Sequence, residues 1–143
     1  MTSRPRSRTR APRSRPGLLL ALSGGGALGS LGRYAVGLAL PHGAGAFAWS
    51  TFLVNVTGSL AMGLLVVWVL SMDEPHPLLR PFLGVGVLGG WTTFSSFTLD
   101  AHTMVTTGRP LLAAAYVVAS FVVGLVAVGL GVTVGERAFG RRP

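Results

Sequence analysis

The chain has 143 residues, half of them hydrophobic, and only 11% of its residues are charged. Soluble domains carry about 25% charged residues, so this deficit favours a protein embedded in lipid. The net charge of +8 is concentrated in arginines near the two ends, and the lack of cysteine excludes disulfides and thiolate metal sites.

The chain opens with an arginine-rich segment, MTSRPRSRTRAPRSRP, which has no apolar residue able to seed a core. This composition predicts a disordered, solvated tail over residues 1–16. No globular segment follows that would support nucleic-acid binding by an arginine-rich arm, so a tail on the cytoplasmic side of a membrane is favoured. A short basic tail is expected at the other end, over residues 137–143.

Apolar segments follow the first tail, and each reaches the roughly 20 residues that a transmembrane helix needs. They lie near 18–40, 47–72, 79–107 and 110–135, separated by short breaks that contain Pro or Gly. Backbone in hydrocarbon must satisfy its own hydrogen bonds, so these spans are expected to be helical. The sequence therefore predicts an all-α membrane protein with four transmembrane helices in one domain over residues 17–136.

Glycines recur four residues apart in the first and last spans, as in Gly25 and Gly29 and again in Gly131 and Gly135. Small residues at this spacing let helices approach closely in lipid. The run GGGALG at 24–29 also satisfies the glycine pattern of dinucleotide-binding folds. No acidic residue follows about 20 positions later, so helix packing is the favoured interpretation.

Polar side chains interrupt the apolar spans. Arg33 lies deep in the first span, where an arginine costs at least ~2.5 kcal/mol. Its side chain either reaches the interface or attracts anions into a water-filled vestibule. Asn55 is an amide in the middle of the second span, and Tyr116 and Ser120 share a face of the fourth. Asp100 either pairs with a basic group or faces a cavity.

The histidines have no second ligand at the spacing of a metal site, and we interpret them as interfacial side chains. They are His42, His76 and His102.

The third span contains the segment GGWTTFSSFT at 89–98, which is rich in glycine and hydroxyl side chains. Non-helical backbone at membrane depth is tolerated where it is buried in protein or lines a wet cavity. The segment therefore predicts a helix broken at mid-membrane. Phe94 and Phe97 are three residues apart and project from one side of the resumed helix. They either face lipid or present their positive ring edges to an anion, and the broken backbone favours the anion.

These residues resemble a known family. GGWTTFSSF is similar to the third-helix signature of the Fluc (CrcB) fluoride channels, usually written GGxTTFSTF. SGGGALGSLGRY resembles the family's glycine-rich first helix, which ends in arginine, and STFLVNVTGSLAMG resembles its GTFxxNxxGSFxxG motif. The resemblance covers roughly residues 20–135.

The resemblance implies a bacterial cell-membrane channel, not an enzyme, that forms an antiparallel, dual-topology dimer with two pores. It implies passive export of fluoride from the cytoplasm, which reduces fluoride toxicity. It also implies a structural sodium ion at the dimer centre, which the main-chain carbonyls of Gly89 and Thr92 would hold. The pore residues that it implies are Asn55, Phe94, Ser95, Ser96, Phe97, Tyr116 and Ser120, with Arg33 as a vestibule charge.

The chain departs from the family pattern at three positions. Ser96 replaces the usual threonine of FSTF, and Asp100 stands where a glutamate is usual. Gly124 stands where a further hydroxyl is expected one turn after Ser120, which leaves part of the polar track unaccounted for.

Two other classes of membrane protein remain as alternatives. A small four-helix, proton-coupled exporter of the multidrug type needs a titratable carboxylate deep in the membrane, typically in the first helix. Here that span carries Arg33 and no acid. A membrane scaffold would explain the glycine packing but neither Asn55 nor the broken third span.

The arginines are distributed unevenly between the two sides of the membrane. One side holds the six arginines of the first tail, Arg80, Arg137, Arg141 and Arg142, whereas the other holds Arg109 alone. Basic segments stay cytoplasmic, so this bias predicts a single orientation with both termini inside. An antiparallel dimer would then need a second, homologous subunit with the opposite bias, and the partner would be a distinct paralogue. Alternatively, dual insertion tolerates the tail.

Overall fold

The computed structural model describes residues 15–140, and every regular element in that range is helical. The helices are α1 (Arg15–Ala39), α2 (Trp49–Leu70), the π-helix η1 (Pro81–Leu88), α3 (Gly89–Trp91), α4 (Phe94–Thr106) and α5 (Pro110–Phe139). The all-α prediction is confirmed over this range. The predictions for the arginine-rich tails fall mainly on residues 1–14 and 141–143, outside the described residues.

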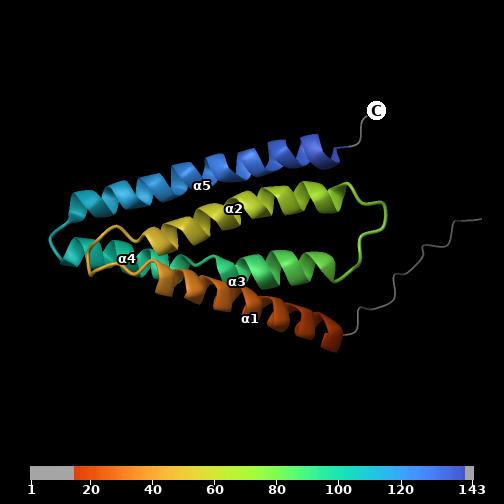
Figure 1. Cartoon of the computed structure of the whole chain (residues 1–143), viewed down its shortest axis with the longest axis horizontal. Coiled ribbons are helices and arrows are strands. Elements are labelled where there is room, and N and C mark those ends of the chain that lie inside the picture. Colours follow the sequence, from red (N-terminus) through yellow and green to blue (C-terminus); the bar gives the residue numbers. More distant parts are fainter. Residues whose placement is uncertain (1–14, 141–143) are drawn as a thin grey trace, which may run out of the picture.

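The long elements run side by side with alternating direction (Figure 1). The start of α1, the connection from α2 to η1 and the end of α5 lie at one end of the bundle. The connection from α1 to α2 and the turn from α4 to α5 lie at the other end. α1 packs along η1 and α3, α2 packs along α5, and α4 packs against α5.

Three helical segments are long and apolar enough to cross a membrane: Trp49–Leu70, Pro81–Thr106 and Pro110–Phe139. They correspond to the second, third and fourth predicted spans, and the chain is a multi-pass membrane protein. α1 has the necessary length, at 25 residues, but is not among the three. Its glycines, serines and Arg33 lower its apolar content.

The helix boundaries differ from the predicted spans by a few residues. Within the described residues, α1 already includes Arg15, the first of them, whereas the predicted span starts near residue 18. α5 extends to Phe139, beyond the expected end near 135. The π-helix η1 was not anticipated, since apolar periodicity does not distinguish it from an α-helix.

Glycines hold α1 against η1 and α3 at backbone distance. A Cβ atom added at Gly25 would lie 2.5 Å from the Phe82 carbonyl oxygen, and one at Gly29 would lie 2.7 Å from the Trp91 amide nitrogen. These distances are too short for a side chain, so the predicted close packing by glycine is confirmed here.

α2 and α5 meet in the same way. A Cβ atom at Gly63 would collide with the Val128 carbonyl oxygen, and one at Gly131 would collide with the Leu60 carbonyl oxygen. Glycine therefore sets the spacing of both helix pairs.

A cluster of buried side chains joins α4 to α5 beside the α1–α2 connection. Its members are Ala48, Phe97, Met104, Ala113 and Tyr116. This cluster fixes the position of α4, which carries the predicted pore residues Phe94, Ser95, Ser96 and Phe97.

Candidate functional site

Two residues with extended backbone interrupt the helical segment between α3 and α4. Thr92 has φ −81° and ψ 160°, and Thr93 has φ −150° and ψ 123°. The Thr93 hydroxyl accepts a hydrogen bond from the Ser96 amide at 3.1 Å, so Thr93 is the N-cap of α4. The chain thus leaves one helix and enters the next within two residues.

Asn55 of α2 bonds both main-chain polar groups of Thr93. Its Nδ2 donates to the Thr93 carbonyl oxygen at 3.0 Å, and its Oδ1 accepts from the Thr93 amide at 2.8 Å. In a continuous helix that amide would donate to the carbonyl of Gly89, four residues earlier. An unpaired buried backbone group is costly, so Asn55 stabilises the interruption.

Two carbonyls beside the interruption lose the donors that a continuous helix would give them. The donor for Gly89 would be the Thr93 amide, which bonds Asn55 instead. The donor for Thr92 would be the Ser96 amide, which bonds the Thr93 hydroxyl. Main-chain oxygens suit hard cations, and these are the two carbonyls that the resemblance assigns to sodium. Within residues 15–140, no group of three His, Asp or Glu side chains offers a metal site.

Arg33 of α1 also contacts the interrupted segment. Its Nε donates to the Gly90 carbonyl oxygen at 3.1 Å, and its side chain is partly buried. The guanidinium therefore lies beside the interruption, deep in the bundle, and not at a helix end. It lines the largest of the cavities described below, and its role as a vestibule charge stays a prediction.

Phe94 and Phe97 lie side by side at the start of α4, with ring centroids 5.8 Å apart and planes inclined by 36°. Their surroundings differ, because Phe94 is 74% exposed and Phe97 only 9%. The Phe97 ring also lies 5.3 Å from that of Tyr116 and 6.0 Å from that of Phe121, with an edge-to-face angle of 88° to the latter. Phe97 is thus fixed by its neighbours, whereas Phe94 presents an open face.

A small cavity of about 120 Å³ lies against these rings, lined by Asn55, Phe94, Phe97, Ser120 and Phe121. The Ser120 hydroxyl is buried and has no hydrogen-bond partner within residues 15–140. Buried polar groups are almost always bonded, so this hydroxyl is available to a guest in the cavity. The predicted pore residues Asn55, Phe94, Phe97 and Ser120 thus come together around one space.

Tyr116 lies one helical turn before Ser120 on α5 and does not line the small cavity. Its hydroxyl is also buried without a hydrogen-bond partner in the described part of the chain, although Thr51 and Asp100 lie near it. The two unpaired hydroxyls on one face of α5 extend the candidate site along that helix.

A larger cavity of about 550 Å³ lies between α1, α2 and α4. The polar and charged side chains that line it are Ser30, Arg33, Tyr34, His42, Ser50, Thr51, Thr93, Ser96 and Asp100. It therefore reaches the interruption from one side, at Thr93, and is the candidate vestibule.

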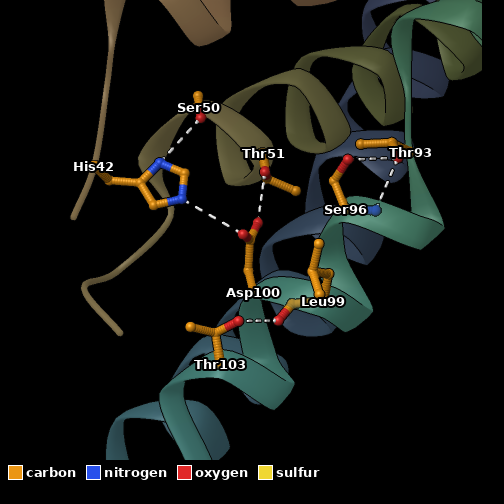
Figure 2. A network of polar contacts seen from close by, with 8 residues as sticks. All are labelled: His42, Ser50, Thr51, Thr93, Ser96, Leu99, Asp100 and Thr103. Atoms are coloured by element: carbon orange, nitrogen blue, oxygen red, sulfur yellow. Dashed lines mark hydrogen bonds and ion pairs between the residues drawn. The ribbon is translucent and has the colours of Figure 1, made fainter. Parts of the chain in front are cut away.

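Figure 2 shows the polar contacts that surround Asp100 in this cavity. The Thr51 hydroxyl donates to Asp100 Oδ2 at 2.7 Å, and His42 Nε2 lies 3.4 Å from Asp100 Oδ1. His42 Nδ1 lies 3.5 Å from the Ser50 hydroxyl. Asp100 therefore does both things that the sequence left open, because it faces a cavity and also meets a basic side chain.

The two predicted pore serines gather around Thr93. The Thr93 hydroxyl donates to the Ser96 hydroxyl at 3.1 Å and lies 3.2 Å from that of Ser95. Ser96 also lines the large cavity, whereas Ser95 is exposed beside it in the sequence. The structure brings both close to the interruption but places neither in the small cavity.

Sequence reasoning did not anticipate the contacts of Thr51 and His42 with Asp100. A signal for Thr51 was present, because it precedes Asn55 by four residues and therefore shares its face of α2. No comparable signal existed for His42, since only the path of the α1–α2 connection brings it to α4.

The comparisons with known proteins agree with this geometry. A family model described as "CrcB-like protein, Camphor Resistance (CrcB)" matches residues 20–132. The "Fluoride-specific ion channel FluC" of Rhodospirillum centenum is 50% identical over 109 residues, which is 76% of this chain and 86% of that protein. The "Fluoride-specific ion channel FluC 2" of Nocardia farcinica is 44% identical over 131 residues, or 92% and 94% of the two chains.

A third relative is longer than this chain. The "Fluoride-specific ion channel FluC 3" of Streptomyces avermitilis is 43% identical over 130 residues, which covers 91% of this chain but 64% of that protein. The family model spans well over half of the chain. The interrupted segment, the Asn55 amide that bonds it, and the Phe94 and Phe97 rings all lie inside the match. The chain therefore belongs to the CrcB family.

Proposed function

We propose that this chain is a passive, fluoride-selective channel of the cell membrane that exports fluoride from the cytoplasm and so limits its toxicity. The observation that carries the proposal is the small cavity, where an amide, a free hydroxyl and two aromatic rings meet beside the interrupted helix. The names of the relatives, which are fluoride-specific ion channels, support it.

The lining of this cavity suits a small, strongly hydrated anion. A pore must replace the water around such an ion with hydrogen-bond donors of its own. The Asn55 amide nitrogen has two N–H donors, of which one bonds Thr93 and the other is left for a guest. Ser120 adds a hydroxyl, the two rings add positive edges, and no carboxylate lines the small cavity.

Flux from liposomes tests the proposal. The chain purified together with its second subunit, in vesicles loaded with potassium fluoride, should release fluoride once an ionophore shunts potassium, as read by a fluoride electrode. Vesicles loaded with potassium chloride serve as the control and should retain their anion. Release of chloride as fast as fluoride would contradict selectivity, and release that requires a proton gradient would indicate an exporter.

The pore is completed in this proposal by an antiparallel dimer with two pores, in which α1 crosses the membrane as the fourth span. The exposed Phe94 ring supports a partner, because it leaves one wall of the small cavity open. The mid-membrane position of the interruption belongs to the same proposal. Cross-linking of cysteines introduced at Phe94 should trap a dimer, and a purely monomeric protein that conducts would contradict it.

A structural sodium ion at the dimer centre is proposed at the Gly89 and Thr92 carbonyls. The Thr93 and Ser96 amides, which would bond these two carbonyls in a continuous helix, bond other groups instead. This supports the site, because a cation can replace the missing amide donors. The dimer should lose stability when a large organic cation replaces sodium. Thr92→Ser should behave as wild type, since it changes neither the carbonyl nor the hydroxyl that bonds Leu88. Stability that is indifferent to sodium would remove the site.

The orientation of the chain is proposed to be single, with both termini in the cytoplasm and a homologous paralogue as the second subunit. The α2–η1 connection, which contains Arg80, and the end of α5, which contains Arg137, lie at one end of the bundle (Figure 1). The α4–α5 turn, which contains Arg109, lies at the other end, and this arrangement supports the charge count made from the sequence. Streptomyces avermitilis has two relatives, named FluC 2 and FluC 3, so paralogues occur together in one organism.

A C-terminal topology reporter on the chain expressed alone tests this orientation. The reporter should signal from the cytoplasmic face only. Equal signals from both faces, or fluoride flux from the chain purified without any partner, would show that it forms a homodimer.

A further inference from the structure

His42 lines the large cavity but has no part in the proposed conduction path. It lies in the connection between α1 and α2, with Nε2 at 3.4 Å from Asp100 Oδ1 and Nδ1 at 3.5 Å from the Ser50 hydroxyl. Both members of the His42–Asp100 pair reach solvent, since their side chains are 28% and 17% exposed. Protons from the adjoining solution can therefore reach His42 through the cavity.

The charges that face His42 are few. Asp100 comes from α4, and Arg33 and Tyr34 come from α1, while α2 contributes only the uncharged Ser50 and Thr51.

Two further groups lie on α5 or directly before it. From α5, Tyr116 lies near Asp100, and Arg109 bonds the Gly45 carbonyl at 3.3 Å without lining the cavity. The lining side chains that carry a formal charge are thus Arg33 and Asp100, which are of opposite sign and cancel when His42 is neutral.

We propose that His42 sets the rate at which anions enter the large cavity, by switching its net charge between zero and +1. The inference rests on the proposed fluoride conduction. A protonated His42 offsets the Asp100 carboxylate, so that the Arg33 guanidinium acts on an approaching anion without opposition. A cavity lined by one sign of charge raises the local concentration of the opposite ion.

The direction of the pH dependence follows from the sign of the charge. Histidine is the side chain that ordinarily changes charge between about pH 5 and 8. Protonation adds a positive charge, so fluoride flux should rise as the pH falls through this range. One unit charge in a water-filled cavity of this size predicts a rise of about threefold.

Flux from liposomes that contain the complete dimer, at a series of pH values equal on both sides, tests the proposal. Wild type should show the threefold rise, about as estimated for one charge. His42→Gln should give a flat profile at the low plateau, and His42→Arg a flat profile at the high plateau. His102→Gln is the matched control, because His102 lies on α4 outside the cavity and should keep the wild-type profile.

Ionic strength separates this role from a structural one. The rise should shrink as the salt concentration approaches 1 M, where the Debye length is about 3 Å. Protein-free liposomes at each pH correct for leakage of neutral hydrogen fluoride. Size-exclusion profiles check that the variants fold, and His42→Asn replaces His42→Gln if the latter does not.

The outcomes are distinguishable. A wild-type slope that survives in His42→Gln and His42→Arg, or a flat wild-type profile at measurable flux, would overturn the role of His42 alone. Absence of flux from wild type at every pH would overturn the proposed function, and this inference with it.

Discussion

The two halves of the interrupted segment, before and after Thr92, are held in place by different kinds of contact. Before it, η1 and α3 lie against α1 through glycines, so that backbone meets backbone. After it, α4 lies against α5 through large side chains, including Phe97 and Tyr116. Contact between backbones sets the distance between two helices but presents no side chains to a bound ion. Contact between side chains also presents ring edges and hydroxyls. The first half therefore holds the segment in position, and the second half supplies the side chains of the candidate pore.

Side chains from α1 and α2 join the two halves. Arg33 bonds the Gly90 carbonyl before the interruption, and Asn55 bonds Thr93 at the interruption itself. Variants on each side should therefore fail in different ways, in folding before the interruption and in conduction after it.

The largest effect is expected from Gly29→Ala in the backbone-packed half. The added Cβ atom would meet the main chain of Val87 and Trp91, which cannot move without displacing the helix. Overpacking of this kind should destabilise the protein by about 3 kcal/mol. Thermal unfolding in detergent measures the loss. Gly24→Ala is the matched control, since its Cβ would meet no atom within 4 Å, and equal stability of the two variants would contradict the glycine-packing account.

Asn55→Ala, which removes the amide that bonds Thr93, should have the next largest effect on stability. It would leave the Thr93 amide and carbonyl unpaired, at a cost of about 2 kcal/mol. Flux should be lost as well, because the cavity loses its amide donor. Thr57→Ala on the same helix is the control, since Thr57 bonds its own helix and the Trp91 side chain but lines neither of the two candidate cavities. Normal flux in Asn55→Ala would exclude the amide from the pore.

Substitutions of Phe94 and Phe97 should have similar effects on fluoride flux but different effects on protein stability. Phe94→Ile and Phe97→Ile should both abolish or severely slow fluoride flux, because each removes a ring edge from the small cavity. Only Phe97→Ile should also lower the stability, by about 1 kcal/mol, since Phe97 packs against other rings and Phe94 is exposed. Phe139→Ile, at the end of α5, is the aromatic control for flux. Normal flux in both pore variants would return the rings to a lipid-facing role.

Much of the fold could be predicted from the sequence because membrane helices leave strong signals. Long apolar runs located the second, third and fourth spans, and glycine spacing located the close contacts at Gly25 and Gly29. The π-helix and the hydrogen bond from Arg33 to the Gly90 carbonyl could not be predicted, since both depend on how the segments dock and not on composition.

The candidate site was predictable where its residues are close in sequence. Phe94 and Phe97 are one turn apart, and the hydroxyl-rich run marked the interruption directly. The partner of Asn55 was not predictable, since Thr93 lies 38 residues away and only the packing of α2 against the third span brings them together. The same limit applies to His42 and Asp100, which are 58 residues apart.

The smallest expected effect concerns the hydroxyl that Gly124 lacks. A Cβ atom added at Gly124 would lie 3.7 Å from the Ser59 hydroxyl oxygen, and both residues line a groove that also contains Ser120. Ser59 of α2 is therefore placed to supply, from the opposite helix, the donor that α5 does not provide. If it does so, Ser59→Ala should slow fluoride flux about two- to threefold, as expected for the loss of one neutral hydrogen bond of modest net strength.

A second substitution, which adds a hydroxyl on α5, makes the prediction for Ser59 specific. Gly124→Ser has room for its side chain, because the nearest atom to its Cβ is that same hydroxyl oxygen. The double variant with Ser59→Ala and Gly124→Ser should recover the wild-type flux, since α5 then supplies to the same groove the hydroxyl that α2 has lost. Gly124→Ala in the Ser59→Ala background controls for the added volume and should stay slow. Equal flux with Gly124→Ala and Gly124→Ser in the Ser59→Ala background would show that packing, and not a hydroxyl, matters at this point. That result would contradict the donor role of Ser59.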